Sequence, residues 1–138
     1  MARKVFFSFH YDDIMNANIV RNSGEFKPTS ETGFYDKSLW EEAKTKGDRA
    51  IQDLIDKGLK NTGVTVFLVG AKTYSRPWCI YERDKSIKDG KGLLGIQLPN
   101  EKATGPNTWL TQNGITVYNW NHDRFADWVE QAAKKAGR

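Results

Sequence analysis

The sequence predicts an α/β protein in which a parallel β-sheet is covered by helices on both faces, a three-layer arrangement. Two kinds of segment alternate along the 138 residues: short apolar runs rich in β-branched residues, and longer runs with apolar residues at helical spacing. Such alternation is typical of strands joined by right-handed helical crossovers. The strongest apolar run, residues 63–69, has the composition of a strand buried on both faces.

Five apolar runs have the length of strands, and helical segments separate most of them. The predicted strands are residues 4–9, 34–36, 63–69, 93–98 and 115–118. The predicted helices are residues 12–21, 38–42, 48–59, 78–88 and 121–137, together with one helical turn near Trp109. Five strands favour the flavodoxin-like order 2-1-3-4-5, in which a crevice opens between the carboxyl ends of strands one and three.

The bulk composition restricts the class of protein. A chain of 138 residues is expected to form one domain, residues 1–138. The net charge of +4 comes from scattered basic residues, which give no support to nucleic-acid or membrane binding through a basic patch. A single Cys excludes an internal disulfide framework, and no apolar run approaches the ~20 residues of a membrane span. We therefore expect a soluble, cytoplasmic protein.

Residues 73–82 carry the strongest indication of a functional site. Pro77 suits the first turn of a helix, because its missing amide hydrogen would have had no partner there. Trp78 and Glu82 are four residues apart, which places both side chains on one face of that helix. An aromatic ring and a carboxylate thus follow the carboxyl end of a central strand, where open α/β sheets bind ligands.

Glu82 is the first candidate for a catalytic residue. A carboxylate beside a developing oxocarbenium ion can stabilise the cation, or hold the ribose hydroxyls, while a glycosidic bond breaks. The alternative is a solvated helix residue that pairs with Lys85 one turn later. From spacing alone, the solvated residue is the more common outcome.

Other aromatic and acidic residues are candidates for binding, each with a structural alternative. Trp78 offers a flat surface for a nicotinamide or adenine ring, or it anchors its helix in the core. Asp36 and Trp40 lie at and after the end of the predicted second strand, where they would close over a ligand or serve as a cap and a packing residue. Cys79 lacks a histidine base beside it and is predicted to pack.

The opposite wall of the crevice is expected at the end of strand one. Ser8, Phe9, His10 and Tyr11 occupy that position and face the segment of Glu82 in the predicted topology. Phe9 would equally serve as the last core residue of its strand, and His10 as an ordinary turn residue.

Several chemistries lack their residues. The chain contains no G-x-G-x-x-G, no G-x-x-x-x-G-K-[ST] and no clustered Cys or His with the spacing of metal ligands. Dinucleotide-binding Rossmann, phosphate-loop and zinc sites are therefore not predicted, and no cofactor or metal is expected. A phosphoacceptor receiver domain needs an aspartate at the end of strand three. This chain has Val69, Gly70 and Ala71 there, so a receiver domain is not predicted either.

Two motifs resemble those of TIR domains. Residues 5–12, V-F-F-S-F-H-Y-D, resemble the opening strand and loop of that family. Residues 75–82, S-R-P-W-C-I-Y-E, resemble its S-x-W-C-x-x-E box with one residue inserted before the tryptophan. The F-F-S-F-H-Y opening and residues 38–41 and 58–62 are similar to the TIR-like proteins of the bacterial Thoeris anti-phage system.

This resemblance implies a flavodoxin-like TIR fold and an enzyme that cleaves the nicotinamide–ribose bond of NAD, its substrate. It also implies cyclisation of the ADP-ribose moiety into a signalling nucleotide that activates a separate effector protein. The family's catalytic glutamate maps to Glu82, its neighbouring aromatic residue to Trp78, and its opposite wall to Phe9, His10 and Tyr11. A noncatalytic interaction module and a nucleotide receptor are the alternatives, and a homo-oligomer remains open. The chain is shorter than the Thoeris TIR proteins, mainly after strand four.

Overall fold

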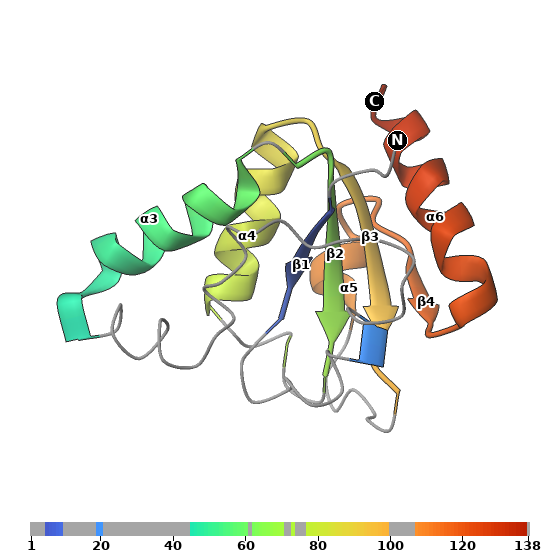
Figure 1. The fold of residues 1–138 in the computed structure, drawn as a ribbon, viewed down its shortest axis with the longest axis horizontal. Coiled ribbons are helices and arrows are strands. Elements are labelled where there is room, and N and C mark those ends of the chain that lie inside the picture. The colour runs from blue at the N-terminus through green and yellow to red at the C-terminus, as the bar shows by residue number, and fades with distance from the viewer. Residues whose placement is uncertain are drawn as a thin grey trace.

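The computed structural model describes residues 5–9, 19–20, 45–60, 62–70, 73, 77–99 and 107–137. In these residues strands and helices alternate along the chain (Figure 1). The elements are β1 (Val5–Ser8), α3 (Asp48–Leu59), β2 (Val64–Val69), α4 (Pro77–Lys88), β3 (Gly92–Gln97), α5 (Thr108–Thr111), β4 (Val117–Asn119) and α6 (His122–Lys135). None of the helices in these ranges is long and apolar enough to cross a membrane.

The four described strands form one parallel sheet in the order β1-β2-β3-β4. This confirms the predicted α/β class with a parallel sheet. The described strands correspond to predicted strands one, three, four and five, in the predicted order. The predicted strand over residues 34–36 lies outside the described residues, as do residues 38–42 and most of 12–21. The five-stranded order 2-1-3-4-5 therefore stays a prediction.

The last strand begins two residues later than its apolar run suggested. Residues 115–118 were the predicted strand, whereas β4 spans Val117–Asn119. The amide of Ile115 donates to the carbonyl of Leu110 (3.2 Å), and its side chain is buried in the core cluster beneath α5. Ile115 is therefore held by α5 and does not join the ladder with β3.

Helices α3 and α6 form where their apolar spacing and end signals predict. A backbone φ angle of 98° at Gly47 breaks the chain before α3, as expected for this glycine. The side chain of Asn121 accepts a hydrogen bond from the amide of Asp123 (3.0 Å) and caps α6. The buried residues of α6 recur every four positions: Phe125, Val129 and Ala133.

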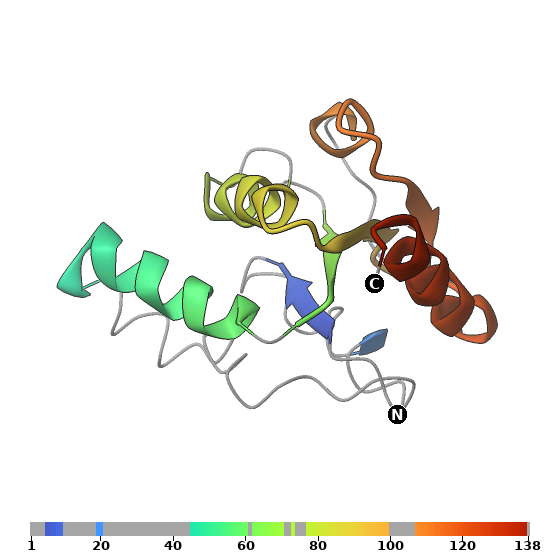
Figure 2. The ribbon, with the colours of Figure 1, turned by 90° about the horizontal axis from the view of Figure 1, so that it is seen from above.

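The two faces of the sheet are covered by different helices (Figure 2). Along β3, a Cβ atom at Gly92 would point at the backbone of α6, whereas one at Gly95 would point at Leu110 of α5. Since successive residues of a strand face opposite sides, α6 lies on one face and α5 on the other. Figure 2 shows α4 on the same side as α5.

Helix α4 is also joined to α3. The hydroxyl of Tyr81 on α4 donates a hydrogen bond to Oδ1 of Asp56 on α3 (2.9 Å). Burial of the phenol, the hydrogen bond to Asp56, and the charges of Asp56, Asp53 and Asp89 together raise the pKa of Tyr81 to about 12. The neutral phenol is therefore the form that links the two helices.

We predict that Gly92→Ala destabilises the protein. The new Cβ would lie 2.9 Å from the carbonyl carbon and oxygen of Ala132 and 3.0 Å from Cα of Ala133, all of them backbone atoms that cannot rotate away. We expect a loss of about 1–3 kcal/mol in the free energy of unfolding, measured by chemical denaturation. Gly63→Ala is the matched control, because its Cβ would meet nothing within 4 Å. Equal unfolding midpoints for the two variants would contradict this packing.

We predict that Tyr81→Phe changes how stability depends on pH. The pKa of Tyr81 is raised from 10.0 to about 12 by folding, so its contribution is complete below pH 10 and is lost as the pH rises towards 12. The wild type should be more stable than Tyr81→Phe below pH 10, and this difference should shrink between pH 10 and 12. Thermal unfolding and phenolate absorbance across this range measure both effects. A difference that stays constant with pH would contradict the assignment.

Candidate active site

The site is built on the face of α4 that is turned towards the sheet. Cys79, Glu82 and Ser86 are the buried residues of this helix, and their spacing places them on one stripe. The hydroxyl oxygens of Ser86 and Thr65 on β2 lie 2.9 Å apart and share a hydrogen bond. This contact shows that the stripe faces the sheet.

Glu82 is almost completely buried, with 1% of its surface exposed. The alternative of a solvated residue pairing with Lys85 is therefore wrong. Glu82 is buried because it lies between Cys79 and Ser86 on the face of α4 that packs against the sheet. A carboxylate is costly to remove from water, and proteins keep one in such a place mainly where a function or a specific partner requires it.

Ser8 lies in the same layer as Glu82. In the parallel register Phe6 is opposite Thr65, and Ser8 is opposite Phe67. Side chains at paired positions point to the same face, so Ser8 shares the α4 face with Thr65.

The two side chains also lie at a similar height along the sheet. Helix α4 runs back along the sheet after β2, so one helical turn from Ser86 to Glu82 climbs ~5.4 Å towards the carboxyl edge. The step from Thr65 to Phe67 along β2 covers a similar ~6.6 Å. Glu82 therefore lies at about the same height along the strands as the paired residues Ser8 and Phe67.

The hydroxyl of Ser8 is buried and has no hydrogen-bond partner within the part of the chain that the structure describes. A buried hydroxyl without a partner costs about 1–3 kcal/mol, so such a group in a native protein needs an explanation. Phe9 is also buried, with 3% exposed, and belongs to the larger core cluster. Its position fits the alternative in which it is the last core residue of the strand.

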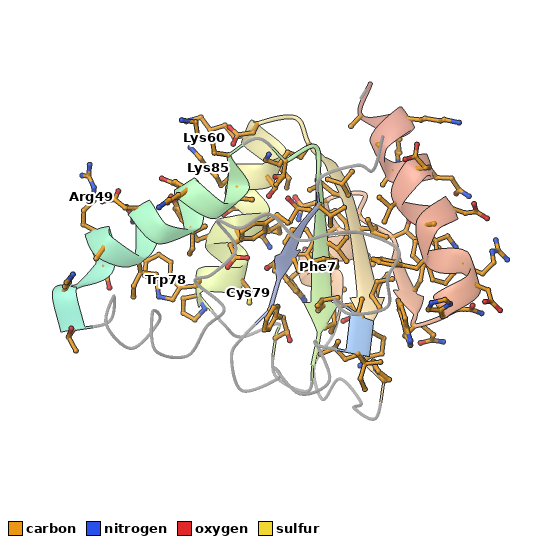
Figure 3. All side chains as sticks on the ribbon, viewed as in Figure 1. Phe7, Arg49, Lys60, Trp78, Cys79 and Lys85 are labelled. Carbon is orange, nitrogen blue, oxygen red and sulfur yellow. The ribbon has the colours of Figure 1, made fainter. Side chains whose placement is uncertain are left out.

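Trp78 and Cys79 diverge at the start of α4 (Figure 3). Trp78 is half-buried, packs against the larger core cluster and meets the ring of Tyr81 edge to face, with centroids 5.6 Å apart. Trp78 therefore anchors its helix and keeps part of its ring accessible. Cys79 is buried in the second core cluster with Phe67 and Val69, as the prediction of a packing role requires.

The other predicted site residues, His10, Tyr11, Asp36 and Trp40, lie outside the described residues, and their roles stay predictions. Among the residues that are described, no group of three or more His, Cys, Asp and Glu is arranged to hold a metal ion.

Thr65 and Ser86 are the site residues that the sequence analysis missed. Both are completely buried. Two signals could have identified them: Thr65 is the polar residue in the apolar run of β2, and Ser86 follows Glu82 by one helical turn. Helix α4 gave no hint of its buried face, because that face carries a thiol, a carboxylate and a hydroxyl instead of aliphatic side chains.

A cavity of about 530 Å³ lies at the opposite, amino-terminal end of the sheet. Its lining combines basic and acidic side chains, including Lys60, Lys85, Asp56 and Asp89 (Figure 3 labels the two lysines). The buried ammonium group of Lys91 borders it and donates to the carbonyl oxygens of Leu59 (2.9 Å) and Thr62 (2.5 Å). This cavity is separate from the predicted site around Glu82.

Comparison with known proteins identifies the family. The family model of the Thoeris protein ThsB, TIR-like domain, matches residues 6–103, a range that includes both Ser8 and Glu82. A protein of Bacillus cereus (strain MSX-D12), named "Putative cyclic ADP-D-ribose synthase ThsB1", is 37% identical over 150 aligned residues, which cover 96% of this chain and 78% of the relative. The chain therefore belongs to the family of ThsB TIR-like domains of Thoeris defence.

Proposed function

We propose that this chain cleaves NAD into nicotinamide and a cyclic ADP-ribose-type signalling nucleotide as part of bacterial anti-phage defence. The name of the B. cereus relative and the membership of the ThsB family support this reaction class. The observation that carries the proposal is the burial of Glu82 on the sheet-facing stripe of α4, at the position to which the TIR resemblance assigns the catalytic glutamate.

In the proposed reaction Glu82 acts on the ribose that carries nicotinamide. When the C–N glycosidic bond breaks, its electron pair goes to the pyridinium nitrogen, so nicotinamide leaves as a neutral molecule and positive charge develops on the ribose. A carboxylate beside that ribose stabilises this charge, or holds the ribose hydroxyls in place. Because Glu82 is withdrawn from bulk water, the attraction is stronger than it would be at the surface.

The fate of the cation decides the product. Attack by water gives ADP-ribose, whereas attack by a nucleophilic atom of the same ADP-ribose moiety gives a cyclic nucleotide. A site that excludes water favours cyclisation, and the depth of Glu82 is consistent with such a site. The cyclic product would then carry the signal to an effector protein.

The substrate would be held between the end of β1 and the start of α4. The hydroxyl of Ser8, which no described residue pairs with, is suited to a polar group of the substrate. The accessible part of the Trp78 ring is suited to stacking, worth ~1 kcal/mol. The proposed substrate-binding residues are Ser8, His10, Tyr11, Asp36, Trp40 and Trp78, and buried Phe9 would support them from the core.

We predict that Glu82→Gln lowers the rate of nicotinamide release by about 10²–10³-fold, because the amide keeps the shape of the side chain but carries no charge. Purified protein is incubated with NAD, and nicotinamide and nucleotide products are identified by chromatography and mass spectrometry. Glu130→Gln makes the same chemical change on α6, on the opposite face of the sheet, and should leave the rate unchanged.

The same assay separates the alternatives. An equal rate from Glu82→Gln and the wild type would refute the role of Glu82. NAD that binds to the wild type but is recovered intact would indicate a nucleotide receptor. Neither binding nor turnover, even in assembled protein, would indicate a noncatalytic interaction module. ADP-ribose as the main product would replace cyclisation by hydrolysis.

A further inference from the structure

We propose that Thr65 and Ser86 are positioning residues that fix the Glu82 carboxylate relative to the sheet. This inference rests on the proposed function, because it assigns to the pair an effect on the reaction through Glu82. The hydroxyl oxygens of Thr65 and Ser86 lie 2.9 Å apart, and both residues are 0% exposed. Ser86 follows Glu82 by one turn on the same buried stripe, so a rotation of α4 about its axis moves both side chains together.

Apolar packing holds α4 through its half-buried flanks, Trp78, Ile80 and Tyr81, whereas the buried stripe between them contributes mainly polar groups. The neighbouring helices α3 and α6 meet the core through Ile51, Ile55 and Leu59, and through Phe125 and Val129. The buried stripe of α4 consists instead of Cys79, Glu82 and Ser86. Apolar contact is non-directional, whereas a hydrogen bond restricts both distance and angle. The Thr65–Ser86 bond is therefore suited to define the rotation of α4 over β2.

Two further polar contacts brace α4 on either side of Glu82. The hydroxyl of Tyr81 donates to Asp56 on α3 (2.9 Å), and Nη1 of Arg83 donates to the carbonyl oxygen of Trp109 on α5 (2.9 Å). Both contacts are only partly buried, and both use long side chains that can follow a small shift of the helix. Ser and Thr have one heavy-atom torsion each, so the Thr65–Ser86 contact is sensitive to a small rotation of the helix.

The expected effect of losing this contact is on the chemical step. Displacing a reacting group by ~1 Å can cost about 10²-fold in rate, and a partial rotation of α4 should cost less. We expect kcat for nicotinamide release to fall about tenfold and KM for NAD to change less than about twofold, because neither Thr65 nor Ser86 is proposed to touch the substrate.

The decisive variant is the double substitution Thr65→Val with Ser86→Ala. Either single substitution leaves the other hydroxyl buried without its partner, which destabilises the protein. Replacing both hydroxyls by apolar groups of similar shape can be nearly neutral for stability. The double variant should therefore regain most of the melting temperature lost by the single variants, while its kcat stays about tenfold low. A kcat that recovers together with the melting temperature would show a merely structural role and overturn the proposal.

Thr65→Ser is the matched control, because it keeps the hydroxyl and removes a buried methyl group. It should lower the melting temperature while kcat stays close to that of the wild type. The control thus lowers the melting temperature and keeps kcat, whereas the double variant keeps most of the melting temperature and lowers kcat. If kcat of Thr65→Ser fell together with its melting temperature, the proposal would also be overturned.

A second measurement is independent of turnover. The NMR signal of the Glu82 carboxyl carbon, assigned by its absence in Glu82→Gln, reports the surroundings of that group in the intact protein. Its chemical shift should move in the double variant and stay in place in Thr65→Ser. If the wild type released no nicotinamide, the proposed function would fail, whereas an unchanged Glu82 signal in the double variant would refute the positioning role itself.

Discussion

Strand β2 is the constraint on which the rest of the structure depends. It is hydrogen-bonded along both edges, to β1 and to β3, and all six of its residues are buried. A strand in this position must be covered on both faces, so helices have to return across the sheet before and after it. The parallel register then fixes which residues of β1 and β3 share a face with each residue of β2. Ser8, Thr65 and the helix that carries Glu82 are brought together by this one arrangement.

The contact between α4 and the sheet departs from the rule that helices meet a sheet through aliphatic side chains. A core built only for stability would place apolar side chains at the positions of Cys79, Glu82 and Ser86, as α3 and α6 do at theirs. Instead, a carboxylate and a hydroxyl are buried there, and Ser8 on the facing strand adds a hydroxyl that has no partner among the described residues. Proteins tend to break local rules of stability at functional sites, and this layer breaks them at Glu82 and Ser8.

The fold also separates two regions of different character. The amino-terminal end of the sheet holds a cavity with mixed charges, where the ammonium group of Lys91 binds carbonyl oxygens at the end of α3 and in the loop that follows it. These contacts tie Lys91 to the turn that follows α3, which is a structural role. The proposed chemistry lies towards the other end, where β1 and β2 finish and α4 begins, in keeping with the general position of ligand sites in open α/β sheets.

The sequence by itself determined the α/β class, the parallel sheet and the order of its four described strands, because apolar periodicity and the handedness of crossovers leave few arrangements. It also placed Glu82 on the helix after β2, since that depends only on local spacing and on Pro77. The tertiary structure alone decided that Glu82 is buried and that Ser86 pairs with Thr65. Helix α4 has no apolar stripe to show which side faces inward, so its orientation came from packing against β2 and from a hydrogen bond between residues 21 positions apart.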